Sequence, residues 1–498
     1  MNMINRLSLG IALAWAITAA LASQQDADNS LASLTLTNAQ GESSQWNGIG
    51  RLNRPDHGQC IATLVDSRDP LMPSSGPAYV ITAGHCVDQR NGVIGHDLPI
   101  EGSISFNYFV DTRDQRQTFP LKRRVWSSMQ GADLALLELD ASLEALMAEG
   151  LTPLKLGDSP APGSQVQVVG EPSNPGLGLR LATCSESDAP FVIEHPWVWR
   201  NLRSNDCPGQ GPGASGSPVI NASKQLIGVL NSVAQPGDDY AAPCGLNNPC
   251  QLSETEITSQ GAVNYSMPLN RLKGCFAEGI ADLTLDSCQL LPGFQLQAQK
   301  WPKLVTKIAT DAEGNHRVPG WDLSFALDTP RYRYKAVRDP LACEDPQDYS
   351  GTIPAAENRI DDPIGPEPGW HFLCLIGVDS PEHPPSPALM ANSLSLAVQL
   401  LPAVPVPAPD MSIEARPNGN VKVTWRTDPP HLSNYRVKRG PPATTDCDDP
   451  AGLRLLRHQS YEFKAAQLPL KLCTVSEDLI DQRSAVRTDL LQSASTDG

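Results

Sequence analysis

The sequence predicts an all-β fold, because short β-like runs follow one another across residues 45–290 and few stretches have helical periodicity. Gly, Pro, Asn and Asp separate these runs, as turn residues do between strands. Many short strands with turn signals between them are typical of a barrel or a sandwich. A short helix is expected at 141–149. The main runs are CIATLV (60–65), AYVITA (78–83), SISFNYFV (103–110), DLALLEL (133–139), SQVQVVG (164–170) and QLIGVLNSV (225–233).

The N-terminal 22 residues have the features of a secretory signal peptide. Arg6 is followed by an apolar run over 7–19 and by a small-x-small site that ends at Ala22. A retained membrane anchor is the weaker alternative, since the apolar run is shorter than the roughly 20 residues that span a bilayer. Residues 23–44 are expected to be either a propeptide or a flexible lead to the β-rich region.

Cysteine content and charge limit the cellular locations and the classes of binding partner that are expected for this chain. The chain of 498 residues has 12 cysteines, an even number without a C-x-x-C zinc pattern, which fits an exported protein with disulfides. Its formal net charge of −17, without a Lys/Arg-rich cluster, argues against nucleic-acid binding. We interpret the acidity as favouring solubility; the alternative is attraction of cationic substrates. The mature protein is expected outside the cytoplasm, extracellular or periplasmic, and free of the membrane.

The C-terminal part is expected to hold two small β-sandwich modules, since 498 residues are too many for one ordinary core. A Pro-rich linker, 400–410, separates module 1 (291–399) from module 2 (411–498). Similar segments on either side of the linker indicate an internal repeat with two cysteines in each copy. The strand patterns around NGNVKVTWR loosely resemble fibronectin type III strands. The repeated segments are YRYKAVRDPLACEDP (332–346) with YRVKRGPPATTDCDDP (435–450), and FLCLIGVD (372–379) with LKLCTVSED (470–478).

Three residues of the β-rich region match the needs of nucleophilic hydrolysis, which are a nucleophile, a base and a group that orients the base. Ser215 lies in GPGASGSPVI, a stretch that could also be a plain turn before a strand. His85 lies in YVITAGHCVD, on a turn after a β-run and beside a cysteine. Asp133 precedes an apolar strand, where a buried acid needs a partner. Among the other histidines, His195 in IEHPW is the nearest competitor to His85.

In this order, TAGHC, DLALL and GASGSP resemble the motifs of the chymotrypsin-like (trypsin-fold) serine endopeptidases. The resemblance covers about half of the chain and implies a chymotrypsin-like double β-barrel over 45–290. It also implies that Ser215 attacks the scissile carbonyl, that His85 transfers the proton and that Asp133 orients His85. The backbone N–H groups of Gly213 and Ser215 would form the oxyanion hole. This chemistry needs no metal or organic cofactor, and its substrate is a protein or peptide.

Other residues depart from the digestive enzymes of that family. Ala214 stands where those enzymes have an aspartate that pairs with a new N-terminus, and no basic residue precedes Ile49. A motif with a non-acidic residue directly before the serine is more similar to that of bacterial secreted glutamyl and lysyl endopeptidases. Asp238 and Asp239 could favour Lys or Arg in the pocket, although a role in capping a solvated loop is preferred. The candidate specificity pocket comprises Gly209 and Leu230, where trypsin-type and glutamyl enzymes have other residues, together with Gln210, Asp238 and Asp239.

Sequence alone does not determine disulfide connectivity, but neighbouring cysteines suggest pairs. The candidate pairs are Cys60 with Cys86, Cys184 with Cys207, Cys244 with Cys250, Cys275 with Cys288, Cys343 with Cys374, and Cys447 with Cys473.

The alternative function is a binding protein with a blocked protease fold that acts through its C-terminal modules. A third interpretation is that these modules are purely structural or related to export.

Overall fold

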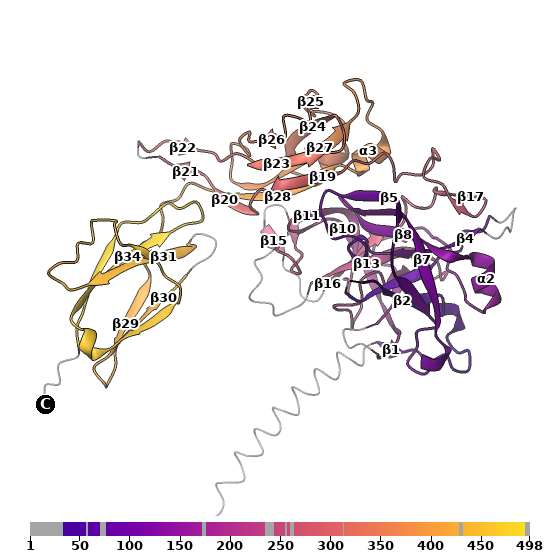
Figure 1. Ribbon diagram of the computed structural model, residues 1–498, viewed down its shortest axis with the longest axis horizontal. Helices are drawn as coiled ribbons and strands as arrows, with labels where there is room; N and C mark the ends of the chain where they lie inside the picture. Colours follow the sequence, from indigo (N-terminus) through magenta and orange to yellow (C-terminus); the bar gives the residue numbers. More distant parts are fainter. Residues whose placement is uncertain are drawn as a thin grey trace, which may run out of the picture. The chain divides into compact units, whose positions relative to one another are not determined.

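The computed structural model describes residues 33–55, 58–69, 76–171, 176–234, 244–253, 256–258, 263–311, 313–427 and 432–493. Strands dominate this part of the chain (Figure 1), which confirms the predicted all-β class. The α-helices within it are short: α2 (Leu143–Ala148) and α3 (Pro387–Ala391). None of the helices in the described ranges combines the length and the apolar character needed to cross a bilayer.

The chain forms two compact units. The first comprises Met1–Trp301, Leu323–Arg359 and Phe372–Ala397, and the second comprises Pro302–Asp322, Ile360–His371 and Val398–Gly498. The first unit contains both barrels described below and part of the chain that follows them.

The first barrel closes because its longest strand pairs with neighbours on both edges. The order β7-β6-β2-β3-β4-β8 returns to β7 through the β7–β8 pairing, and β5 pairs with the C-terminal half of β7. Apolar side chains such as Leu64, Val80 and Leu137 fill the interior, as the alternation along the runs requires. The strands are β2 (Ile49–Asn53), β3 (Cys60–Leu64), β4 (Pro77–Thr82), β5 (Ile94–Pro99), β6 (Ser103–Phe106), β7 (Gln117–Met129) and β8 (Asp133–Ser142).

The second barrel closes in the same way. The order β10-β11-β16-β13-β12-β9 returns to β10 through the β9–β10 pairing. Val168, Val219 and Ile227 belong to its interior. Two such rings in one chain are the arrangement expected from the sequence for 45–290. The strands are β9 (Gln165–Gly170), β10 (Arg180–Glu194), β11 (Trp197–Asn205), β12 (Pro218–Ile220), β13 (Leu226–Ala234) and β16 (Val263–Pro268).

The described part of the N-terminal lead packs on the barrels. Strand β1 (Leu34–Thr35) pairs with β10, and the Asn38 side-chain amide donates a 2.8 Å hydrogen bond to Asn107 Oδ1. Three short 3-10 turns follow in the described part of the first barrel: η1 (Ser44–Trp46), η2 (Gly84–Cys86) and η3 (Arg113–Gln115). The signal peptide and the first part of the lead lie outside the described residues, so their processing stays a prediction.

After the second barrel the chain continues in short strands. Within the first unit, β24 pairs with β27 from Arg331↔Val378 to Val337↔Phe372. Within the second, β20 runs parallel to the end of β28. The remaining strands up to the linker are β14 (Gln251–Ser253), β15 (Glu256–Thr258), β17 (Phe276–Ala277), β18 (Ile280–Ala281), β19 (Leu296–Lys300), β20 (Val305–Lys307), β21 (Ala309–Thr310), β22 (His316–Arg317), β23 (Leu323–Leu327), β24 (Arg331–Val337), β25 (Ile353–Pro354), β26 (Arg359–Ile360), β27 (Gly369–Val378) and β28 (Leu394–Leu401).

The chain beyond the linker folds as two small sheets around one core. One sheet has the order β29-β30-β33 and the other β32-β31-β34-β35. Val423, Trp425 and Leu472 are buried between them, an arrangement that suits the expected second β module; the boundaries of both modules stay predictions. The strands are β29 (Met411–Ala415), β30 (Val421–Trp425), β31 (Asn434–Gly440), β32 (Arg454–Leu455), β33 (Ser460–Phe463), β34 (Leu470–Glu477) and β35 (Arg487–Leu491).

A buried arginine fastens the chain around α3 to the second barrel within the first unit. Arg200 of β11 is 2% exposed. Its guanidinium donates to the Ala391 and Ser393 carbonyl oxygens at 3.1 and 3.0 Å, and to the Glu344 carboxylate at 3.2 Å. It also donates to the Ser395 hydroxyl. Because the guanidinium is planar and donates to several acceptors at once, Arg200 holds this segment to β11 in one defined position.

All 12 cysteines are paired in the structure. The six bridges join the same partners that the sequence suggested. They are Cys60–Cys86, Cys184–Cys207, Cys244–Cys250, Cys275–Cys288, Cys343–Cys374 and Cys447–Cys473.

Candidate active site

The first barrel brings His85 and Asp133 together. His85 lies on the η2 turn just after β4, and Asp133 is the first residue of β8, which pairs with β4. One carboxylate oxygen of Asp133 accepts the backbone N–H of His85 at 2.8 Å, and the other lies 2.7 Å from His85 Nδ1. Gly84 permits this approach, because a Cβ there would collide with the backbone of Ser128 and Leu134. The two bonds fix the imidazole with its Nδ1 edge toward the carboxylate.

The environment favours the protonated form of His85. Burial by itself lowers the pKa of the imidazole, but the charge and the hydrogen bond of Asp133 outweigh it, and Glu194 adds a smaller attraction. The net result is a pKa above the ordinary histidine value. The Asp133 side chain is only 3% exposed, so its carboxylate depends on His85 for compensation.

Ser215 lies in the second barrel, in the turn that leads into β12. Its carbonyl oxygen accepts the backbone N–H of Ile61, which connects this turn to the first barrel. Gly213 has a φ of +95°, a conformation that costs most other residues free energy. Among the hydrogen bonds of the described residues, the N–H groups of Gly213 and Ser215 serve as donors to no acceptor. Both N–H groups are therefore free to bind a ligand oxygen.

His85, Asp133 and Ser215 line one cleft of about 870 Å³. Gly213 and Leu230 line it too, whereas Gly209 and Gln210 do not. Gln210 instead donates to the Pro208 carbonyl oxygen at 3.3 Å. Asp238 and Asp239, the remaining residues of the candidate specificity pocket, lie outside the described residues. The cleft is also lined by Gly58, Gln59, Cys60, Cys86, Gln89, Met129, Glu194, Trp197, Trp199, Gly211, Pro212, Asn231, Ser232, Val233, Leu246 and Asn247.

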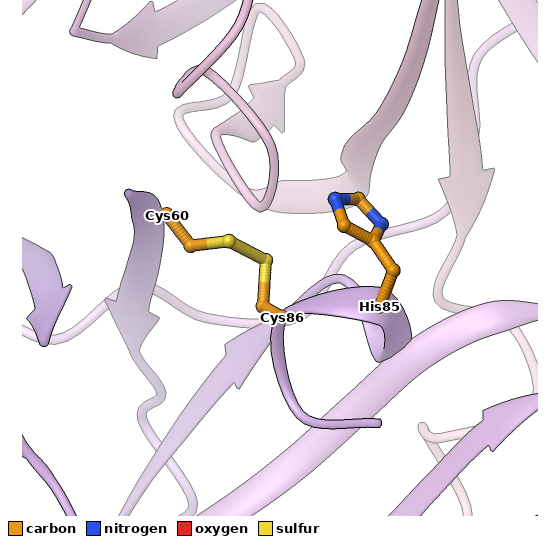
Figure 2. A group of neighbouring side chains, drawn as sticks. All are labelled: Cys60, His85 and Cys86. Carbon is orange, nitrogen blue, oxygen red and sulfur yellow. A yellow bond between two sulfur atoms is a disulfide. The ribbon is translucent and has the colours of Figure 1, made fainter. Parts of the chain in front are cut away.

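The Cys60–Cys86 bridge lies beside this histidine. Figure 2 shows the disulfide joining the strand that carries Cys60 to the turn from which the His85 imidazole projects. These three residues are also close enough to form a cluster of metal-ligand types. Their sulfurs are joined to each other, and metals bind thiolates, so the bridge holds the turn and leaves no thiolate for a metal.

The structure adds residues to the site that sequence reasoning passed over. Glu194 ends β10 and lines the cleft together with Trp197 and Trp199. His195, the competitor of His85, is not among the lining residues, and its backbone N–H donates to the Cys244 carbonyl oxygen at 2.8 Å. The signal that could have found Glu194 was its place in IEHPWVW, an acid between β-branched and aromatic residues.

One family model and several solved structures are similar to parts of this chain. Residues 62–229 match the family model of the trypsin-like peptidase domain. A comparison with curated proteins gave no match. Solved structures similar to the chain include the MamO protease domain from Magnetospirillum magneticum, with 16% identity, 46% of this chain and 95% of that chain covered and a TM-score of 0.31. The thermostable serine protease AL20 from an extremophilic microorganism is 14% identical, with 45% of this chain and 92% of that chain covered and a TM-score of 0.30. A Glu endopeptidase is 15% identical, with 40% of this chain and 85% of that chain covered and a TM-score of 0.29.

Proposed function

We propose that the trypsin-like peptidase domain of this chain, matched over residues 62–229, is the catalytic part of a secreted serine endopeptidase. The observation that carries the proposal is the position of His85. The buried Asp133 carboxylate accepts the backbone N–H of His85 with one oxygen and contacts Nδ1 of its imidazole with the other. Its ring opens onto the same cleft as Ser215. A serine, a histidine and an orienting acid in one cleft are the parts that acyl transfer to serine requires.

Each residue has a defined role in the proposed reaction. Ser215 Oγ attacks the scissile carbonyl carbon while His85 Nε2 takes the hydroxyl proton. The N–H groups of Gly213 and Ser215 stabilise the oxyanion of the tetrahedral intermediate. The C–N bond then breaks, the leaving amine takes the proton from His85, and an acyl-enzyme remains on Ser215. Water, deprotonated by His85, attacks the ester carbonyl. The second tetrahedral intermediate then collapses, Ser215 Oγ leaves with the proton from His85, and the carboxylic product is released. Asp133 keeps the proton of neutral His85 on Nδ1 and stabilises the imidazolium.

The fold supports a site that does not need a freed N-terminus. Ile49 lies inside β2, fully buried and paired with Thr63. Ala214, directly before Ser215, is buried and donates its N–H to the Gly211 carbonyl oxygen at 3.0 Å. Neither position offers the ion pair by which digestive enzymes complete their oxyanion hole, so maturation here would act by another route.

The disulfides support the proposed location. Six bridges in one chain are typical of proteins that fold in an oxidising compartment. Together with the signal-peptide pattern, they favour an extracellular or periplasmic protein. The substrates would be proteins or peptides, and the β modules would serve as accessory parts.

A fluorophosphonate probe tests the proposal, because it reacts only with a serine activated by an assembled site. We expect the purified protein to be labelled, and the Ser215→Ala and His85→Ala variants to remain unlabelled. Ser223→Ala, at an exposed turn serine, is the matched control and should be labelled like the wild type. An unlabelled but folded wild type, with its N-terminal lead removed, would favour the alternative of an inactive protease-fold binding protein.

A further inference from the structure

A buried carboxylate stands in the wall of the cleft next to the reaction centre. Glu194 is 8% exposed and lies at the end of the β10–β11 hairpin, where it pairs with Trp197. Oε2 accepts the Ser232 hydroxyl at 2.7 Å and the Trp199 indole N–H at 3.4 Å, and Oε1 accepts the Asn247 N–H at 3.1 Å. All three donors are neutral. Among the described residues no Lys or Arg forms an ion pair with this carboxylate.

The surroundings of Glu194 suit a cationic side chain. The rings of Trp197 and Trp199 stack with their centroids 5.7 Å apart and their planes 12° from parallel, and both residues line the cleft. Indole faces attract Lys and Arg and pack against their methylene stems. An apolar, aromatic wall that ends in a carboxylate therefore matches an aliphatic stem that ends in a positive charge.

A second polar group in the same wall is unsatisfied. Asn231 is 6% exposed, and among the described residues neither its Nδ2 nor its Oδ1 has a hydrogen-bond partner. The β13–β16 register shifts between Leu230 and Ser232, so Asn231 is the extra residue of a bulge. Bulges redirect side chains near active sites, and here Asn231 and Ser232 both line the cleft. A buried amide without partners points to a polar ligand that completes its hydrogen bonds.

We infer that Glu194 selects substrates that carry a Lys or Arg side chain near the scissile bond. The inference rests on the proposed peptidase function and names its substrate class. The side chain lies along the indole wall, its charge pairs with Glu194, and Asn231 bonds polar groups of the bound peptide. The acidity of the whole chain, −17, helps to attract such substrates.

Matched peptides test the inference. The set consists of fluorogenic hexapeptides in which one Lys, or its uncharged counterpart norleucine, occupies each position in turn. We expect at least about a tenfold higher kcat/KM for Lys at one position, the size of a close charge pair at an interface. Glu194→Gln should bring this ratio near one by lowering kcat/KM for the Lys peptide. Glu186→Gln is the matched control: Glu186 is also a buried carboxylate of β10, but it contacts Arg203 and does not line the cleft.

The wild type provides a test that needs no variant at this site. Burial raises the pKa of Glu194, against the three hydrogen bonds and the attraction of His85. Within the described ranges Glu194 also acts on Tyr265 of β16, whose pKa burial and this carboxylate raise to about 12. The carboxylate is therefore neutral at low pH, and the Lys-to-norleucine ratio should fall as pH falls. The titration of His85 affects both peptides equally and cancels in the ratio.

Binding separates failure of this inference from failure of the proposed function. The Ser215→Ala variant should bind the fluorescein-labelled Lys peptide more tightly than the norleucine peptide, and Glu194→Gln in that background should remove the difference. This result with no cleavage by the wild type would refute the peptidase but keep the cationic site. A ratio near one in the wild type, an unchanged ratio in Glu194→Gln, or equal losses for both peptides with a lower melting temperature would overturn the assignment.

Discussion

Asp133→Asn isolates the orienting carboxylate without changing its size. An amide has one acceptor oxygen, whereas His85 uses both oxygens of the carboxylate. One accepts the His85 backbone N–H at 2.8 Å and the other lies 2.7 Å from Nδ1. If the amide oxygen keeps the backbone bond, the amide NH2 faces Nδ1. It then holds the ring proton on Nε2, where His85 cannot act as the base for Ser215. If the amide turns over, two donors face each other in a buried place.

The expected loss follows from these two costs. A buried unpaired donor costs about 1–3 kcal/mol. Loss of the carboxylate charge beside the imidazolium adds about 4 kcal/mol for unit charges about 4 Å apart at an effective dielectric constant near 20. The sum, about 5–7 kcal/mol, corresponds to a decrease in kcat of roughly 10⁴- to 10⁵-fold, in line with the loss typical of such a substitution.

The assay is peptide hydrolysis under saturating substrate, with the rate of fluorophosphonate labelling measured in parallel. Asp111→Asn is the control, since the Asp111 carboxylate also accepts two backbone N–H groups, from Asn38 and Ala39, but lies outside the cleft. That variant should keep its activity. A decrease of less than about tenfold in Asp133→Asn, with the fold intact, would refute the assigned role of the carboxylate.

Three further predictions follow from the same contacts. Because the pKa of His85 is raised and the base must be neutral, kcat/KM should fall with decreasing pH at an inflection above about 6.5; an inflection at or below that value in the pH–rate profile would contradict it. Arg200→Met removes a buried guanidinium from Glu344 and from backbone acceptors and should cost about 3–5 kcal/mol in the free energy of unfolding, measured by denaturant titration, whereas a loss below about 1 kcal/mol would show that the anchor is dispensable. Gly216→Ala places a Cβ against the Ile61 carbonyl oxygen at a φ of +81°, so a marked drop in melting temperature is expected, and an unchanged one would show that the turn adjusts.

The sequence contained enough to predict the barrels and the candidate triad, because those signals are local. Alternating strands, a turn with His85 and a glycine-rich turn with Ser215 each depend on a few neighbouring residues. The local pattern around Glu194, IEHPWVW, indicates a buried acid but does not show that Glu194 lies in the cleft. It reaches the cleft only because the β10–β11 hairpin closes beside β13 and the Cys244–Cys250 loop supplies the Asn247 N–H. Gly209 and Gln210 were placed by counting back from Ser215, and counting does not show that the turn directs them away from the cleft.

The anchor at Arg200 also bears on the order of events during biogenesis. The backbone N–H of Arg200 donates to the Gly131 carbonyl oxygen at 3.2 Å, two residues before Asp133, and the Gln130 side chain donates to the Asn392 carbonyl oxygen, 262 residues later in the chain. The turn that delivers Asp133 is thus completed by a segment that leaves the ribosome long after both barrels. We expect a nascent chain that ends near residue 290 to lack this brace, so that the turn before Asp133 is completed only after residue 392 has been synthesised.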